Sequence, residues 1–348
     1  MAEKETPKTK KVTTKTESPK KTVTKKTTTK PKTKIPKVKE SKSKMVKKEV
    51  GQTKKEPANI KILGFNNLPL NTYVYEKVES PKAVVVIVHG MQEHCLRYKD
   101  FAEHLNKNGF IAIASDLRGH GRTAESKEHL GFGEEDIFVE TLEDQINIIN
   151  FAKEAYDLPI YLFGHSYGSM LGQNIIQKTQ LVEKCVLCGT MNGGSAIMKL
   201  GKIAVNCLSP FKKEYSKGGL LEKMCIKSYG KKFERGNWLT RDEKIFDEYL
   251  KDEYCGGSFP FSFYKSLIKN MNKTNKRLEK VGNKKILFIA GDKDPVGANG
   301  KQVKKLYKVY LKHNINAKIK IYKDARHELL NEINKDEVYK DIVDFYNN

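Results

Sequence analysis

Short apolar runs alternate with amphipathic segments from residue 59 onward, and this alternation restricts the fold more than any other feature of the sequence. The runs that resemble buried strands are residues 83–88, 110–114, 160–163, 185–188 and 286–290. Unbroken apolar runs of this length are typical of parallel strands covered on both faces. Segments with helical spacing lie between them, at residues 98–108, 137–155, 169–177 and 303–313. The pattern predicts an α/β fold with a mostly parallel sheet and helices on both faces.

The two ends of this region fit the same architecture. Residues 60–65 and 72–78 predict an opening hairpin, because β-branched residues flank a turn that contains Asn66, Asn67 and Pro69. Residues 318–322 predict a last strand and residues 337–346 a last helix.

The alternation breaks between residues 193 and 280, where glycine pairs separate short amphipathic pieces. We predict that this segment is a helical lid inserted between late strands. Such an insertion would lie above the carboxyl ends of the strands, where ligands bind in open α/β sheets. Nine of its apolar residues are candidates for an acyl channel, although at least half of them are expected to be ordinary core of the lid: Ile203, Val205, Leu208, Phe211, Leu220, Leu221, Phe259, Phe261 and Phe263.

Residues 1–58 have a different composition, rich in Lys, Thr and Pro. The first 56 residues contain 20 Lys and 6 Glu, with no Arg or Asp, so they carry +14 of the formal net charge of +23. A segment without aromatic residues or periodicity cannot bury enough apolar surface to fold, so we predict a disordered basic tail and a folded domain over residues 59–348. The tail is expected either to contact anionic membrane or nucleic acid weakly or to act only as a solvated extension. Sequence-specific reading of nucleic acid is less favoured than either, because no aromatic platform accompanies the charge.

The six cysteines are too few for a disulfide scaffold in 348 residues. Cys185 and Cys188 form a C-x-x-C, but they lie within an apolar run, so a structural role is expected for them. We find no signal-peptide pattern and no apolar run of membrane-spanning length. These observations favour a cytoplasmic protein, with a peripheral position at a membrane surface as the alternative.

The sequence Gly-His-Ser-Tyr-Gly at 164–168 matches the G-x-S-x-G nucleophile elbow. It follows the predicted strand 160–163 and precedes the predicted helix 169–177, as a strand–turn–helix elbow requires. Ser166 is therefore the predicted nucleophile. The alternative is a glycine-rich turn in which Ser166 only caps the helix, and His165 is expected to pack behind the turn.

A serine hydroxyl needs a base to become a nucleophile, and in this fold the acid and then the histidine follow the serine along the chain. Asp292 and Asp294 follow the strand 286–290, and both remain candidate acids at this point. His327 follows the strand 318–322 and is the candidate base, with an ordinary loop histidine as the alternative.

The predicted oxyanion donors are two backbone amides. One is the N–H of Tyr167, directly after the nucleophile. The other is the N–H of Met91, because the preceding Gly90 frees the loop at 89–94. His89, Glu93 and His94 in that loop could be imagined as metal ligands, but no further ligand cluster accompanies them, so we expect no metal and no organic cofactor.

Four motifs together resemble the monoacylglycerol lipase and lysophospholipase branch of the α/β-hydrolases, a serine aminopeptidase-like family, and especially its bacterial members. They are His-Gly-Met-Gln-Glu-His at 89–94 with Arg97 and Tyr98 after it, Asp-Leu-Arg-Gly-His-Gly at 116–121, the elbow at 164–168, and Gly-Asp-Lys-Asp-Pro-Val at 291–296 with Ala-Arg-His-Glu at 325–328.

The resemblance implies an α/β-hydrolase fold over the whole folded region. It implies a triad of Ser166, Asp294 and His327, with oxyanion donors at Met91 and Tyr167. It also implies a serine hydrolase that cleaves carboxylic esters with one acyl chain, a monoacylglycerol or a lysophospholipid, through an acyl-enzyme and without an obligate protein partner. Human-type members usually carry a small residue where this chain has Met91, so the width of the acyl pocket, and with it the preferred chain length, is expected to differ from theirs.

Two alternatives to this function remain. The first is a peptidase or small-ester esterase on the same fold, because a fold does not determine a substrate. The second is a hydrolase whose basic tail gives it a binding role on nucleic acid or anionic membrane.

Overall fold

The computed structural model describes residues 57–348, apart from the side chains of Ile197, Cys225 and Lys227. The predicted tail therefore lies outside the described residues, except for Pro57 and Ala58, and Ala58 already begins the first strand.

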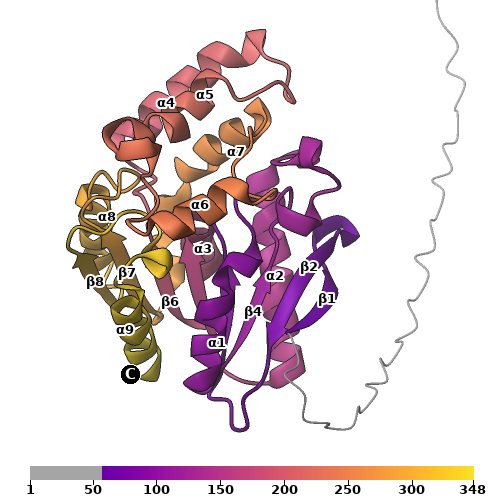
Figure 1. Ribbon diagram of the computed structural model, residues 1–348, viewed down its shortest axis with the longest axis vertical. Coiled ribbons are helices and arrows are strands. Elements are labelled where there is room, and N and C mark those ends of the chain that lie inside the picture. Colours follow the sequence, from indigo (N-terminus) through magenta and orange to yellow (C-terminus); the bar gives the residue numbers. More distant parts are fainter. Residues whose placement is uncertain (1–56) are drawn as a thin grey trace, which may run out of the picture. The chain divides into compact units, whose positions relative to one another are not determined.

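A sheet of eight strands forms the centre of the described region (Figure 1). In chain order the strands are β1 (Ala58–Leu63), β2 (Pro69–Tyr75), β3 (Ala83–Val88), β4 (Phe110–Ser115), β5 (Ile160–His165), β6 (Val182–Cys188), β7 (Lys285–Gly291) and β8 (Ala317–Tyr322). Across the sheet their order is β1-β2-β4-β3-β5-β6-β7-β8. The β1–β2 and β2–β4 pairs are antiparallel, and the other neighbours are parallel. The carboxyl ends of β3 to β8 therefore lie along one edge of the sheet.

Helices cover both faces of this sheet. They are α1 (Lys99–Lys107), α2 (Ile137–Tyr156), α3 (Tyr167–Lys178), α8 (Lys301–Lys312) and α9 (Lys335–Asn347). Alternate residues of β3 face opposite ways: Val86 belongs to the core cluster that includes α2, α3 and α8, and Val85 to the cluster that includes α1 and α9. The predicted fold class, a mostly parallel sheet covered on both faces, is confirmed.

The opening hairpin differs from its predicted bounds. Phe65 was expected at the end of the first strand but belongs to the turn, which closes with a hydrogen bond from Gly64 N to Leu68 O at 2.8 Å. Asn66 and Asn67 both have positive φ there, so the tight turn starts earlier than the β-branched pattern indicates. Both strands accordingly end a few residues before their predicted ends.

Cys185 and Cys188 lie on opposite faces of β6. Cys185 packs in the cluster with α2 and α3, and Cys188 packs in the cluster with α1 and α9. Both are fully buried and unpaired. Their positions agree with a structural role for this C-x-x-C.

The segment at 193–280, here called the insertion, separates β6 from β7. It contains α4 (Ala196–Leu208), α5 (Leu220–Glu222), α6 (Glu243–Lys251) and α7 (Phe261–Met271), which gather at one end of the sheet (Figure 1). It meets the loop after β8, where the N–H of Glu328 donates to the carbonyl of Leu239 at 2.7 Å. The insertion thus covers part of the carboxyl edge. No described helix is long and apolar enough to cross a membrane.

Gly291, the last residue of β7, lies against the loop after β8. A Cβ at this position would be 2.0 Å from the carbonyl oxygen of Ala325 and 2.4 Å from that of Arg326. These are backbone atoms, so the loop could not relieve the clash by turning a side chain. The absence of a side chain at residue 291 therefore sets the spacing between the loops that carry Asp294 and His327.

We expect Gly291→Ala to lower the free energy of unfolding by about 1–3 kcal/mol, the usual cost of overpacking. The measurement is urea unfolding at neutral pH. Gly194→Ala is the matched control, because a Cβ there would meet no atom closer than 3.5 Å. Equal stability of the two variants would contradict the close approach at Gly291.

Candidate active site

A sharp turn between β5 and α3 carries Ser166. Its φ of 50° and ψ of −117° are unusual for a residue with a side chain. Two glycines permit the turn: a Cβ on Gly164 would lie 2.6 Å from the carbonyl oxygen of Gly168, and one on Gly168 would lie 2.1 Å from that of Val88. The turn therefore has the form of a nucleophile elbow, with Ser166 at the N-terminus of α3.

His327 follows β8 and lies against Asp294, which follows β7. Nδ1 of His327 is 2.9 Å from Oδ1 of Asp294, and both side chains are buried. The two atoms meet the distance of a hydrogen bond but not its angle; catalytic pairs of this kind often tighten only when substrate binds. Asp294 Oδ1 also accepts the N–H of Val296 at 2.9 Å, which orients the carboxylate. A histidine held in this way can act as a general base.

Asp292, the alternative acid, does not lie against His327. Its Oδ1 accepts the N–H of Asp324 at 2.8 Å, and its side chain is 35% exposed. It joins the loops after β7 and β8 from the solvent side. Asp294 is therefore the carboxylate that can serve His327.

Two aromatic side chains and Gly189 pack around the imidazole of His327. The Trp238 ring lies 5.0 Å from it and the His165 ring 4.8 Å, between centroids. A Cβ on Gly189 would come within 2.9 Å of its Cε1. Nε2 of His327 is buried without a hydrogen-bond partner among the described residues, and His327 borders the same cavity as Ser166. This nitrogen is available to accept a proton.

Met91 and Tyr167 are neighbours of Ser166 at the larger cavity. Tyr167 begins α3, and the first N–H groups of a helix have no partner within it. Met91 and Ser166 together border both cavities at the site. The loop before Met91 touches the elbow, since a Cβ on Gly90 would be 3.2 Å from Cβ of Ser166. This arrangement can offer two N–H groups to an oxygen that gains negative charge.

Ser166 stands where two cavities meet. The larger has a volume of about 90 Å³, and its walls are mostly apolar. Five methionines line it, together with Leu267 and Ile268 of α7: Met91, Met170, Met191, Met198 and Met224. The smaller has a volume of about 20 Å³ and is bordered by polar side chains that include Gln92, Tyr249 and Glu328.

Most of the predicted acyl-channel residues do not line the larger cavity. Of the nine, Leu221 lines the larger cavity. The bulky side chains of Ile203, Phe211 and Leu220 are more than half exposed, and Val205 and the three phenylalanines are buried in the core. Apolar character alone did not indicate which side of each insertion helix faces Ser166.

The histidines of the loop after β3 are bound to protein groups. Nε2 of His89 accepts the N–H of Leu117 at 2.9 Å, and His94 pairs with Asp252 at 2.8 Å. Within the part of the chain that the structure describes, His94, Asp252 and Cys255 bring potential metal-ligating atoms within 4.8 Å of one another. The imidazole and carboxylate of this group already hydrogen-bond each other.

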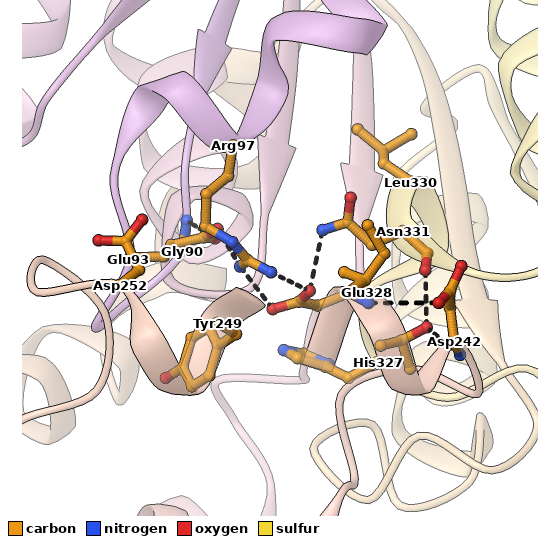
Figure 2. A network of polar contacts seen from close by, with 12 residues as sticks. Gly90, Glu93, Arg97, Asp242, Tyr249, Asp252, His327, Glu328, Leu330 and Asn331 are labelled. Carbon is orange, nitrogen blue, oxygen red and sulfur yellow. Dashed lines mark hydrogen bonds and ion pairs between the residues drawn. The ribbon is translucent and has the colours of Figure 1, made fainter. Parts of the chain in front are cut away.

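A buried polar network that the sequence analysis missed lies behind the site (Figure 2). Arg97 binds both Glu93 and Glu328, and Glu93 also contacts His165. Burial by itself lowers the pKa of His165, but the hydrogen bond to the Glu93 carboxylate and the charges of Glu93 and Glu328 outweigh it, so the pKa is raised above its ordinary value. The signal available in the sequence was the Glu93–Arg97 spacing of four residues.

The chain is similar to known hydrolases in sequence and in structure. A family model described as "Serine aminopeptidase, S33" matches residues 79–334. A monoglyceride lipase homolog of Monkeypox virus is 26% identical over 78% of this chain and 92% of its own length. Phospholipase YtpA of Bacillus subtilis is 24% identical over 76% of this chain and 95% of its own length. The crystal structure of a thermostable carboxyl esterase from Bacillus coagulans superposes with a TM-score of 0.76 and 27% identity, covering 84% of this chain and 98% of that one.

The raised pKa of His165 predicts a pH-dependent contribution to stability. A raised histidine pKa stabilises the fold fully below the pKa of the unfolded chain, about 6.5, and this stabilisation is lost as the pH rises through the folded pKa. We therefore expect the stability difference between wild type and His165→Gln to be largest near pH 6 and to shrink toward pH 9.

The measurement is denaturant unfolding of both proteins across that pH range. The groups that face the ring are Glu93, Glu328, Arg97, Tyr98 and His327, and all of them remain in the variant. A difference that widens with rising pH would contradict the charged state inferred for His165.

Proposed function

Because the chain belongs to the serine aminopeptidase S33 family and is a carboxylic ester hydrolase, we propose that it cleaves esters of a single fatty acyl chain, with a monoacylglycerol as the preferred substrate. In this proposal Ser166 is the nucleophile, His327 the general base and Asp294 the acid that orients it. The observation that carries the proposal is the position of Ser166 between a long apolar cavity and a small polar one.

The proposed reaction begins with attack of Ser166 Oγ on the ester carbonyl while His327 Nε2 takes the hydroxyl proton. The carbonyl oxygen becomes negative and accepts hydrogen bonds from the N–H groups of Met91 and Tyr167. Asp294 stabilises the imidazolium that forms on His327. Both side chains are buried, which strengthens this interaction.

Breakdown of the tetrahedral intermediate releases the alcohol. His327 gives its proton to the leaving oxygen, and the acyl group remains on Ser166 as an ester. Water then enters, His327 takes one of its protons, and the resulting hydroxide attacks the acyl-enzyme. The fatty acid leaves, and the proton returns to Ser166.

The two cavities support a division of the substrate between them. The apolar walls of the larger cavity suit a hydrocarbon chain, whose burial is favourable by roughly 0.8 kcal/mol per methylene. The polar side chains that border the smaller cavity suit a short polar alcohol such as glycerol. The ester carbonyl would then lie at Ser166, where the cavities join.

The charges around the smaller cavity favour an uncharged head group. Arg97, the cation behind this cavity, already binds Glu93 and Glu328 through both terminal nitrogens. It is not available to pair with the phosphate of a lysophospholipid. We therefore place lysophospholipids second, as substrates that are cleaved more slowly.

The same ion pairs argue against an aminopeptidase. Such an enzyme needs a carboxylate to bind the amino terminus of its substrate, and the two carboxylates at this cavity, Glu93 and Glu328, already pair with Arg97 and His165. Cleavage of small esters remains the second candidate function, because short acyl chains would also enter the larger cavity.

The surface of the insertion supports a lipid substrate. Leu200, Ile203 and Phe211 are 62%, 59% and 85% exposed, and lysines at 199, 202 and 212 lie beside them in the sequence. An apolar surface flanked by lysines suits an anionic lipid layer. Contact between the basic tail and anionic membrane or nucleic acid stays a prediction, because residues 1–56 lie outside the described residues.

A panel of purified substrates tests the proposal. We expect 1- or 2-monoacylglycerols to be cleaved at least about tenfold faster than lysophospholipids of the same chain, and amino-acid amides not at all. Ser166→Ala should lose activity on every substrate and labelling by a fluorophosphonate, because the hydroxyl is the nucleophile. Faster cleavage of amides than of esters would contradict the proposal, and labelling of Ser166→Ala would identify another nucleophile.

Narrowing the larger cavity should change the preferred chain length. Gly201 on α4 lines this cavity opposite Ile268, so Gly201→Leu would fill part of it. We expect the ratio of kcat/KM for 16-carbon over 8-carbon p-nitrophenyl esters to fall at least about fivefold. Asn206→Leu is the control, because Asn206 lies on the same helix and is exposed. An unchanged ratio in Gly201→Leu would mean that the acyl chain binds elsewhere.

A further inference from the structure

A buried charge network joins the three loops that meet at Ser166 (Figure 2). Glu93 belongs to the loop after β3, which carries Met91. His165 precedes Ser166 in the elbow, and Glu328 follows His327 in the loop after β8. The side chains of these three residues and of Arg97 are at most 10% exposed.

Glu93 accepts hydrogen bonds at both carboxylate oxygens. Its Oε1 accepts the N–H of Gly90 at 2.6 Å and the hydroxyl of Tyr98 at 2.8 Å, and lies 3.1 Å from Nδ1 of His165. Its Oε2 accepts from Nη1 of Arg97 at 2.8 Å. The bond to the Gly90 N–H holds the His89–Gly90 peptide, and the Gly90 carbonyl, which shares a peptide with the Met91 N–H, lies 2.8 Å from Nδ1 of His89.

Arg97 extends this constraint to the histidine loop. Its Nη1 and Nη2 donate to Oε1 and Oε2 of Glu328 at 2.7 and 2.6 Å, a two-pronged arrangement that sets orientation as well as distance. Asn331 also donates to Glu328 at 2.9 Å. Glu328 adjoins His327 in the chain, so the position of the base depends on the same guanidinium as the oxyanion loop.

His165 completes the network from the elbow. Its Nδ1 faces the Glu93 carboxylate at 3.1 Å, and its Nε2 faces the carbonyl of His327 at 3.3 Å. Both partners are acceptors, so the ring satisfies both only when each nitrogen carries a hydrogen. The charges of Arg97 and His165 then balance those of Glu93 and Glu328, which makes the burial of all four tolerable.

We propose that Glu93 and Arg97 are positioning residues. Together with Glu328 they hold the Met91 amide and the His327 imidazole at the positions relative to Ser166 that the reaction needs. Neither residue touches the reacting atoms. Their effect on the rate comes through the geometry of the two loops that Arg97 connects. The inference rests on the proposed ester cleavage at Ser166.

The test compares Glu93→Gln, Glu328→Gln and the double variant as full-length proteins. Glutamine keeps the size of the side chain and an oxygen for the Gly90 N–H, but it removes the charge that binds Arg97. Cleavage of p-nitrophenyl octanoate is measured well below the melting temperature, with active sites counted by fluorophosphonate titration. An alkyl boronic acid, whose adduct with the serine is tetrahedral, reports on the oxyanion donors.

We expect kcat to fall about 10- to 100-fold in each single variant while KM changes less than about threefold, because the lost interaction serves the transition state. Glu93→Gln should also weaken boronic acid binding about tenfold. The double variant should lose much less than the product of the two single losses, because both act through Arg97. A loss of kcat in the double variant that equals the product of the two single losses would overturn the coupling. A kcat within twofold of wild type in Glu93→Gln would overturn the role of Glu93.

A matched control separates positioning from general stability. Asp144 on α2 forms an equally buried pair with Arg118, which donates hydrogen bonds of 2.9 Å to both oxygens of the Asp144 carboxylate. Asp144→Asn should lower the melting temperature while kcat stays within about twofold of wild type; an equal loss of kcat there would assign the effect to stability. If Glu93→Gln does not fold, Arg97→Lys, which keeps the charge but not the two-pronged bond, takes its place. Ester cleavage by Ser166→Ala would refute the proposed function itself, whereas these outcomes bear only on the positioning role.

Discussion

The elbow at Ser166 depends on contacts between backbone atoms that a single methyl group would prevent. Gly168 packs directly against the carbonyl of Val88 at the end of β3, and Gly291 packs against the carbonyl of Ala325 in the loop after β8. The first contact joins the end of β3 to the turn after β5, and the second joins the end of β7 to the loop after β8. Because the strands are parallel, the residues that follow them meet at one edge, and side chains separated by up to 237 positions, from Met91 to Glu328, line one small cavity.

The sequence predicted the sheet and its helices well because both depend on local patterns. Unbroken apolar runs such as Ala83–Val88 are required wherever a strand is covered on both faces, and the runs end at the residues that carry the chemistry. The predicted positions of Ser166 and His327 followed from the same rule, since each lies just after a strand, whereas the choice of Asp294 over Asp292 came from the family resemblance. The hairpin bounds were wrong at Phe65, because two asparagines with positive φ form a turn that the β-branched pattern does not reveal.

The interior of the insertion and the charge network could not be predicted in the same way. The insertion consists of short helices whose apolar residues occur on more than one side, so Phe211 and Leu221 look alike in the sequence although one is exposed and the other buried. The pairing of Arg97 with Glu328 joins residues 231 positions apart, and no periodicity links them. Interactions of this kind become visible only when the loops have been placed in space.

The walls of the larger cavity have a consequence for how the protein recognises hydrocarbon. Five of the six methionines in the described region border it, and only Met271 does not. A thioether chain is unbranched and polarizable, and it changes its rotamer at little cost. Methionine side chains can adapt to a kinked or a straight acyl chain. Discrimination among lipids would therefore depend on the polar end of the substrate and not on the shape of its acyl chain.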